Sequence, residues 1–218
     1  MKKHAPILLT GFEPFGGDAL NPSQEIVRAL DGETVGAHRI VGAVLPVAFA
    51  TAPALLDALV ERHRPAIVLA LGLAGGRGEL SFERIAVNLI DARIADNEGA
   101  QPIDEAVVAS APPAYFSTLP LKAIVADLRA RGIPAGLSLS AGTFVCNQVF
   151  FALAHQLTTH HPQVRGGFLH VPWLPEQAAR HPGQPSMALA TMVEGVHAAL
   201  ECALAVRDDL RESGGTIA

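Results

Sequence analysis

Short apolar runs alternate with amphipathic stretches along most of the chain. The runs 6–12 (PILLTGF) and 66–73 (AIVLALGL) contain no polar alternation, which is typical of strands that are buried on both faces. The stretch 51–63 repeats its leucines at helical spacing, and Pro65 follows it. Strands and helices that alternate in this way predict an α/β fold with a largely parallel sheet and helices on both faces.

The same patterns place the remaining elements and the domain boundaries. They predict strands at 39–45, 80–90, 135–140 and 167–171, and helices at 22–30, 120–131, 143–160 and 186–210. Residues 91–119 are rich in Pro, Asp and Asn, which predicts a long irregular segment. The chain shows no internal repeat and no linker, so we expect one domain over residues 1–218, with a loose tail at 210–218.

Composition excludes several classes of protein. Half of the 218 residues are hydrophobic, which is enough to bury a core without disulfides. Two cysteines indicate free thiols in a reducing compartment, so we expect a cytoplasmic protein. Gly, Pro and charged residues interrupt every apolar run, so we expect no signal peptide and no membrane span. The net charge is −5 and the basic residues are scattered, which argues against nucleic-acid binding.

The segment 140–147 (SAGTFVCN) combines a strand end, a turn of small residues and the start of a helix. Cys146 falls in the first helical turn, where unpaired N–H groups and the helix dipole stabilise a thiolate. The small residues would let a substrate carbonyl approach backbone N–H groups that form an oxyanion hole. Cys146 also stands in helical register with apolar residues, and free cysteines are commonly small buried hydrophobes. The local pattern by itself favours that structural alternative.

His170 and Glu83 are the residues that would act with this cysteine. His170 stands near the end of the strand 167–171, where it would deprotonate Cys146 and later protonate a leaving amine. A lone histidine is more commonly a structural residue, and the pairing with Cys146 balances the two interpretations. Glu83 lies in a strand-like segment. It would orient His170 if it pointed inward, and it would be a surface charge if it pointed outward.

Three further segments are rich in glycine or polar residues. Phe12 and Phe15 stand among glycines after the first strand, where they would form a flat apolar slot or an ordinary turn. The loop 72–78 (GLAGGRG) is reminiscent of a phosphate cradle, but it lacks both the P-loop ending and the GxGxxG spacing. Residues 91–99 (DARIADNEG) predict an ordered loop near the site.

Other chemistry-bearing residues favour structural roles. The neighbours His160 and His161 have a poor geometry for shared ligation, so we expect no metal site. Cys202 stands in a helical stripe of apolar residues, which indicates packing in the core or at a subunit contact.

Taken together and in order, several segments resemble the pyroglutamyl peptidases of the cysteine type (pyrrolidone-carboxylate peptidases). The segments are GFEPFGG, GLAGGRG, ERIAVN, DARIADNEGAQPID, SAGTFVCN, GFLHVPWLPEQ and PSM. They extend from about Leu9 to Met187 and so span most of the chain. Each is weak alone, whereas the set is highly specific.

The resemblance implies a fold, an activity and an assembly. It implies a single α/β/α domain with a twisted mixed sheet, often assembled as a tetramer, so a homo-oligomer (tetramer or dimer) is expected. It implies a cysteine exopeptidase that hydrolyses the amide bond after an N-terminal pyroglutamyl residue. The substrates would be peptides that begin with pyroglutamate, and no cofactor is expected.

The resemblance also implies a set of site residues. The triad falls on Cys146, His170 and Glu83, and the arginine near the oxyanion is Arg93. The substrate pocket would be lined by Phe12, Phe15, Ile94, Phe144 and Val145, with backbone groups near Leu73 contacting the lactam amide.

A few positions depart from the family pattern. Leu73 stands where the glycine loop commonly has Gln, which leaves binding intact only if that position contacts the lactam through its main chain. Val47 and Val149 replace Thr and Met, which would reshape the pocket modestly. Ala95 replaces a usual proline. None of these changes touches the triad.

Two other classes of function are weighed against the peptidase. A non-catalytic ligand-binding domain would have no need of Cys146, His170 and Glu83 together. A nucleoside- or phosphate-handling enzyme is suggested only by the loop 72–78. That enzyme would depend on phosphate and be indifferent to thiol alkylation, whereas the peptidase would lose activity rapidly with iodoacetamide.

Overall fold

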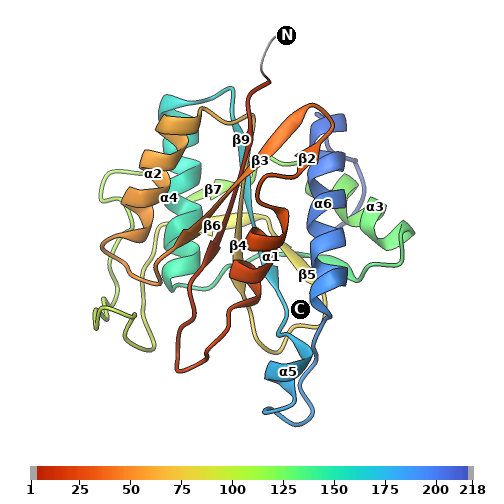
Figure 1. Cartoon of the computed structure of the whole chain (residues 1–218). Coiled ribbons are helices and arrows are strands. Elements are labelled where there is room, and N and C mark those ends of the chain that lie inside the picture. Colours follow the sequence, from red (N-terminus) through yellow and green to blue (C-terminus); the bar gives the residue numbers. More distant parts are fainter. Residues whose placement is uncertain (1–3, 216–218) are drawn as a thin grey trace.

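The computed structural model describes residues 4–215 and consists of a seven-stranded sheet with helices on both faces (Figure 1). The strand order is β2-β3-β1-β4-β9-β5-β8. These strands are β1 (Ile7–Phe12), β2 (Thr34–Val35), β3 (His38–Leu45), β4 (Ile67–Leu73), β5 (Leu80–Glu83), β8 (Ala135–Ser138) and β9 (Arg165–Val171). The helices are α1 (Pro22–Leu30), α2 (Ala52–His63), α3 (Leu121–Ala130), α4 (Val145–His160), α5 (Pro175–Ala178) and α6 (Leu189–Ala205).

Strand direction changes once inside the sheet. The strands β3, β1, β4 and β9 run parallel to one another. β5 then runs antiparallel to β9, and β8 runs parallel to β5. At the other edge, β2 pairs antiparallel with β3. The predicted single-domain α/β class with a mixed, mostly parallel sheet is therefore confirmed.

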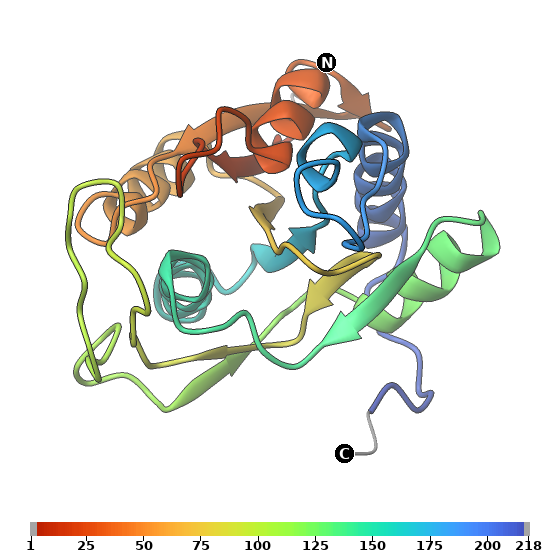
Figure 2. The ribbon, with the colours of Figure 1, turned by 90° about the horizontal axis from the view of Figure 1, so that it is seen from below.

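The two faces of the sheet bury separate hydrophobic clusters, because successive side chains along a strand point to opposite faces. On β4, Ile67, Leu69 and Leu71 pack into the cluster that includes α1, α3 and α6. Val68 and Ala70 pack into the other cluster, with α2 and α4. The view in Figure 2 shows α2 and α4 close together and apart from α1, α3 and α6.

The end of β1 is fastened to the start of α1. Asn21 caps the helix by accepting a hydrogen bond from the N–H of Ser23 at 3.1 Å, and the Ser23 hydroxyl accepts one from the N–H of Phe12 at 2.9 Å. Gly11 is required at this junction, because a Cβ there would lie only 2.4 Å from the carbonyl oxygen of Ser23. The loop that follows Phe12 therefore leaves the sheet in a fixed direction.

Two helices differ from their predicted bounds by two residues or more. α4 begins at Val145 rather than at residue 143, which leaves Cys146 in the first turn. The last helix runs over Leu189–Ala205, not 186–210. It ends early because Asp209 accepts hydrogen bonds from the N–H groups of Lys122 and Ala123 at the start of α3. The chain must therefore leave the helix to bring that carboxylate to α3.

The predicted strand 80–90 is two strands, not one. Its first part is β5 of the main sheet, and its second part is β6 (Ile85–Val87). β6 pairs antiparallel with β7 (Ala114–Phe116), which lies within the stretch predicted to be irregular. The sequence patterns also miss β2 and α5, which have two and four residues. Elements this short leave no periodicity to recognise.

The described part of the chain contains no helix long and apolar enough to cross a membrane. The predicted tail, 210–218, is described as far as Gly215, and residues 216–218 lie outside the described residues.

Replacing Gly11 by Ala should destabilise the protein by about 2 kcal/mol, because the new methyl group must push the backbone of Ser23 away from β1. The free energy of unfolding from urea denaturation would measure this loss. The matched control is Gly215→Ala, where a Cβ meets nothing within 4 Å. Equal stability of the two variants would contradict the close packing of β1 against α1.

Candidate active site

Three neighbouring strands bring the candidate residues to one face of the sheet. Gly72 of β4 is the register partner of His170 of β9, and His170 is in turn the partner of Ser81 of β5. Glu83 lies two residues after Ser81 and therefore points to the same face. This face is the one that α2 and α4 cover.

Glu83 and His170 form a buried hydrogen bond. Nδ1 of His170 lies 2.7 Å from Oε1 of Glu83, whose side chain is completely buried. His170 is 4% exposed, and the ring of Phe168 contacts it edge-on at 4.9 Å between centroids. Because Nδ1 is engaged with the carboxylate, Nε2 is the ring nitrogen left for proton transfer.

Arg77 is a second partner of the same carboxylate, and no sequence pattern identified it. Its guanidinium donates to Oε1 of Glu83 at 2.8 Å, and it also reaches the carbonyl oxygen of Ser140 at 3.4 Å. Arg77 stands in the glycine loop 72–78, so this loop contacts the catalytic candidates rather than remaining open for a phosphate. The signal in the sequence was the charged residue inside an otherwise small and apolar loop.

Cys146 is positioned at the start of α4 with its sulfur over β4. A Cβ built on Gly72 would lie 2.9 Å from Sγ of Cys146 and 2.9 Å from Cζ of Phe168. Only glycine therefore leaves room for the thiol at this point of the strand. Since His170 is the register partner of Gly72, the thiol lies over the strand position directly beside His170.

Burial determines the protonation of these groups. Burial and, to a smaller extent, the negative charge of Glu83 raise the pKa of the Cys146 thiol to about 12. The positive charge of Arg77 acts in the opposite direction. Burial also lowers the pKa of His170 below its ordinary value, although Glu83 opposes this. Burial would raise the pKa of Glu83, but the hydrogen bond and charge of His170 and the hydrogen bond of Arg77 hold it below its ordinary value. The resting site thus contains a thiol, a neutral imidazole and a carboxylate. The sequence pattern favours a thiolate at this helix start, but burial and the Glu83 charge outweigh the backbone N–H groups there.

The turn that precedes Cys146 is joined to the segment after β6. The Thr143 hydroxyl donates to the carbonyl oxygen of Asp91 at 2.8 Å, and the N–H of Asp91 donates to the carbonyl oxygen of Thr143 at 3.0 Å. The completely buried Asn147 side chain bonds the backbone of Val87 and of Leu89. Asn147 is a further residue that the sequence patterns missed, because its polar character gives no hint of burial beside the cysteine.

Most of the predicted pocket residues lie in one hydrophobic cluster. Phe12 and Val145 are buried in this cluster. Phe15, Phe144 and Cys146 are partly exposed and pack against it. Two further predicted residues belong to loops: Leu73 is the last residue of β4, and Ile94 stands half-buried in the segment after Asp91. The structure therefore brings Phe12, Phe15 and Phe144 into the same hydrophobic cluster as Cys146.

The loop after β1 and the segment after β6 are tied by side-chain hydrogen bonds. Asn97 donates to Oε1 of Glu13 at 2.8 Å and to the carbonyl oxygen of Pro14 at 3.0 Å. The same Glu13 oxygen accepts a bond from the N–H of Val47 at 3.1 Å. One carboxylate oxygen thereby joins three separate parts of the chain at the rim of the pocket.

The segment 88–113 is also folded by its own polar side chains. Asp96 accepts hydrogen bonds from the N–H groups of Phe49, Glu98 and Ala100. Asn88 pairs with the backbone of Val108 through both its oxygen and its nitrogen. These bonds order a stretch that has little regular secondary structure.

Arg93, the candidate for contacts with the oxyanion, is exposed in this segment. Within residues 4–215 it forms no ion pair and no side-chain hydrogen bond. It lies two residues after Asp91, which is bonded to the turn before Cys146. The structure thus places Arg93 near the start of α4 without fixing its guanidinium.

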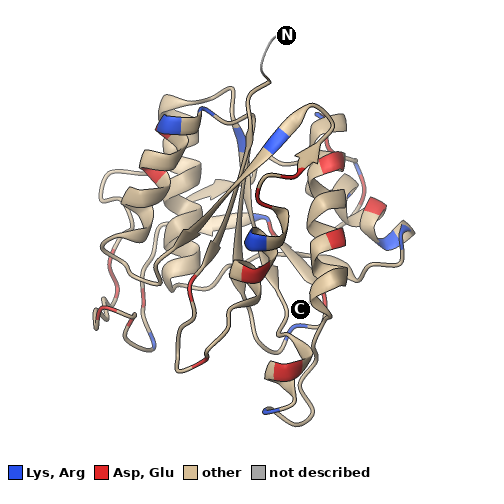
Figure 3. Ribbon diagram, viewed as in Figure 1, with Lys and Arg blue, Asp and Glu red and all other residues tan. Residues whose placement is uncertain are grey.

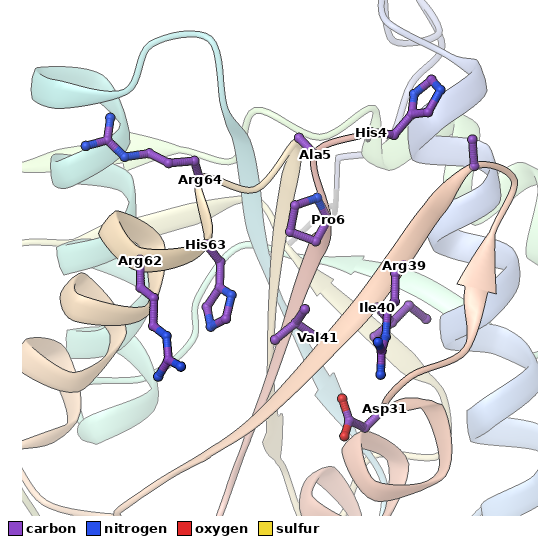
Figure 4. Close-up of a pocket in the computed structure, with 11 residues that line it drawn as sticks. His4, Ala5, Pro6, Asp31, Arg39, Ile40, Val41, Arg62, His63 and Arg64 are labelled. Carbon is purple, nitrogen blue, oxygen red and sulfur yellow. The ribbon is translucent and has the colours of Figure 1, made fainter. Parts of the chain in front are cut away.

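A larger cavity lies elsewhere in the molecule. It has a volume of about 1250 Å³ and is lined by residues 4–6 before β1, by Arg39 and Val41 of β3, and by residues 62–64 at the end of α2 (Figure 4). It therefore lies where β1 begins, whereas the candidate residues lie toward the opposite end of the sheet. It contains no cysteine or other candidate nucleophile.

Charged residues do not define another site. Lys and Arg positions are spread over several helices, strands and loops and alternate with Asp and Glu (Figure 3). In the part of the chain that the structure describes, no group of three His, Cys, Asp or Glu side chains is arranged to hold a metal ion.

Comparison with known proteins assigns the chain to a family. The family model described as pyroglutamyl peptidase matches residues 5–206. The pyrrolidone-carboxylate peptidase of Cupriavidus taiwanensis is 58% identical over 212 residues, which are 97% of this chain and 98% of that protein. The corresponding peptidase of Bacillus thuringiensis subsp. konkukian is 48% identical over 96% of this chain and 98% of its own length.

Solved structures agree with this assignment. The crystal structure of pyroglutamyl peptidase I from Bacillus amyloliquefaciens superposes with a TM-score of 0.93 at 41% identity and covers 96% of this chain and 100% of that chain. The pyrrolidone carboxyl peptidase from Thermococcus litoralis also gives a TM-score of 0.93 at 41% identity, over 96% and 99% of the two chains. The chain therefore belongs to the pyroglutamyl peptidase family and is a hydrolase of the cysteine-peptidase class.

Proposed function

We propose that the protein removes an N-terminal pyroglutamyl residue from peptides, with Cys146 as nucleophile, His170 as acid and base, and Glu83 as the residue that orients His170. The observation that carries this proposal is the buried bond between Glu83 and His170 at 2.7 Å, directly beside the strand position over which the Cys146 thiol lies. A nucleophile, a base and an orienting carboxylate are the parts that covalent acyl transfer requires.

The aromatic side chains that share a hydrophobic cluster with Cys146 suit a pyroglutamyl ring. Pyroglutamate is a neutral lactam, so its pocket needs apolar walls and a few polar groups at the amide edge. Phe12, Phe15 and Phe144 supply the walls in this proposal, together with Val145 and Ile94. Backbone groups at Leu73 contact the lactam amide, so its departure from the common Gln does not remove the contact.

The reaction begins with a thiol rather than a thiolate. As Sγ of Cys146 attacks the pyroglutamyl carbonyl carbon, its proton passes to Nε2 of His170, and Glu83 stabilises the imidazolium that forms. The carbonyl oxygen gains the negative charge. In this proposal the backbone N–H groups at the start of α4 and the exposed side chain of Arg93 stabilise that charge.

Collapse of this intermediate breaks the carbon–nitrogen bond. His170 returns the proton to the departing amine, which leaves a thioester on Cys146. A water molecule then gives a proton to His170 and attacks the thioester carbon. The carbon–sulfur bond breaks, free pyroglutamate departs, and the proton returns to the thiol.

Cys146→Ala and His170→Ala should each abolish release of a chromogenic amine from its pyroglutamyl amide, because each removes a group that forms or transfers a bond. A loss of at least about a thousandfold in kcat is expected for either variant. The matched control is Cys202→Ala, which removes the other cysteine and should retain activity. Full turnover by folded Cys146→Ala would refute the proposed nucleophile.

Alkylation should reveal the protonation of Cys146 in the free enzyme. Because the pKa of this thiol is raised to about 12, the rate of inactivation by iodoacetamide should rise about tenfold per pH unit through neutral pH and beyond. The Cys202→Ala variant restricts the reaction to Cys146, and mass spectrometry confirms the site. A rate that levels off below pH 7 would instead indicate a preformed thiolate.

Arg77→Met should lower kcat by about tenfold with little change in KM, because it removes a hydrogen bond to the buried charge of Glu83. The charge of Arg77 lowers the pKa of His170, so its removal raises that pKa. The acid limb of the kcat/KM profile should therefore move to higher pH, and Arg77→Lys should restore it in part.

The control for Arg77 is Arg84→Met. Arg84 lies 5.9 Å from the centroid of the Phe116 ring and makes no hydrogen bond to Glu83 among the described side chains. This variant should leave the acid limb in place. An unchanged profile in Arg77→Met, or an equal shift in both variants, would show that Arg77 does not act through Glu83 and His170.

A further inference from the structure

A second hollow adjoins the proposed pyroglutamyl pocket. It has a volume of about 420 Å³ and lies beyond the ends of β4 and β9. Its walls are the loop 15–18, Leu73 with Gly75, and three residues after β9, namely Trp173, Arg180 and His181. The loops after β1 and β4 and the helix α5 gather at the lower end of the view in Figure 1, where these walls lie.

This hollow shares two of its walls with the proposed ring pocket. Phe15 and Leu73, which belong to the proposed ring pocket, also line it. Leu73 directly follows Gly72, over which the thiol lies, and Trp173 follows His170 by three residues. The N–H of Ala74 donates to the carbonyl oxygen of Val171 at 3.0 Å, so the two strands remain side by side up to the hollow.

One wall is a pair of stacked rings. The rings of Trp173 and His181 are nearly parallel, at 10° with 4.5 Å between centroids. Trp173 packs so closely on the glycine loop that a Cβ on Gly75 would lie 2.4 Å from its ring. The indole is therefore held in place by the loop and by His181, and it lines the hollow as a rigid aromatic wall.

The charged groups of the hollow are satisfied by one another. Asp18 accepts a hydrogen bond from the completely buried Gln177 at 3.1 Å and forms an ion pair with Arg180 at 3.4 Å. These contacts fix the loop 15–18 against the segment after β9. The carboxylate and the guanidinium neutralise one another, and the remaining walls are three rings, one leucine and the glycines of two loops.

We propose that this hollow, the leaving-residue subsite, binds the side chain of the residue that follows pyroglutamate, and that it favours aromatic and large aliphatic side chains. The proposal rests on the proposed function. His170 donates its proton to the amine of that residue, so the residue must lie on the His170 side of the scissile bond, where the subsite begins. The volume of about 420 Å³ accommodates a large side chain and falls within the usual range of ligand sites.

Kinetics with two substrates test the preference. Wild type should cleave pyroglutamyl-phenylalanine amide with a kcat/KM about tenfold higher than that of pyroglutamyl-alanine amide. Trp173→Ala should reduce this ratio to near one. His181→Ala, which removes only the exposed partner of the stack, should reduce it in the same direction with little risk to folding. The control Phe116→Ala removes another exposed aromatic ring and should leave the ratio unchanged.

Fluorescence gives a readout that is independent of turnover. Trp173 is the single tryptophan of the chain, so intrinsic emission reports on the subsite alone. In the Cys146→Ala variant, pyroglutamyl-phenylalanine amide should change this emission with saturation, whereas pyroglutamic acid, which lacks a following residue, should not. An equal response to both ligands would overturn the proposal.

The outcomes separate the subsite from the proposed function. If wild type cleaves neither amide, the proposed function fails and the subsite fails with it. If wild type cleaves both amides with equal kcat/KM and Trp173→Ala lowers both equally, the peptidase activity stands and the subsite preference is refuted.

Discussion

The candidate site depends on the reversed direction of β5. Because β5 runs antiparallel to β9, it starts at the edge of the sheet where β4 and β9 end. From there it runs back into the sheet, so that Glu83 pairs with Phe168 rather than with His170. The carboxylate is therefore set behind the imidazole and below the edge, where no solvent reaches it. The same reversal brings the glycine loop, which precedes β5, to the edge, and from there Arg77 extends inward to Glu83. A parallel β5 would have placed the carboxylate at the rim and the loop at the far end.

A buried carboxylate in this position couples stability to chemistry. Removing one partner of a buried ion pair typically costs about 3–5 kcal/mol, because the remaining charge is left without compensation. Oε1 of Glu83 accepts from both His170 and Arg77, whereas Oε2 accepts no hydrogen bond from any residue in the described range 4–215. The two ion-pair contacts thus converge on a single oxygen atom. His170 and Arg77 are consequently needed to keep the charge inside the fold as well as to hold the imidazole in one tautomer.

The sequence predicts the parts of this arrangement that leave a local pattern. The apolar runs of β1 and β4 and the start of α4 near Cys146 follow from periodicity and turn residues, so the amino-acid order alone indicates the α/β class. It places Cys146 at a helix start, but the local pattern favours a structural cysteine, and the family resemblance is what singles it out as the nucleophile. The direction of β5 leaves no such pattern, because the same four residues serve either direction. The end of α6 at Ala205 and the role of Arg77 also leave no local pattern. The first depends on the hydrogen bonds from α3 to Asp209, and the second on the ion pair with Glu83. Family resemblance identifies Glu83 and His170 together, whereas their individual contexts leave both interpretations open.

The segment 88–113 has a different consequence, which concerns local stability. Its order comes from hydrogen bonds that Asp96, Asn88 and Asn97 form with nearby backbone groups and with the loop after β1. The segment contributes only a few side chains to the hydrophobic clusters. Segments of this kind form cooperative units that open at a smaller free energy than the global transition. Glu83 and His170, by contrast, are carried by central strands. Amide hydrogen exchange would therefore show strong protection in the central strands that carry Glu83 and His170. The amides of the segment 88–113 would exchange faster, because this segment opens and closes many times before the sheet itself unfolds.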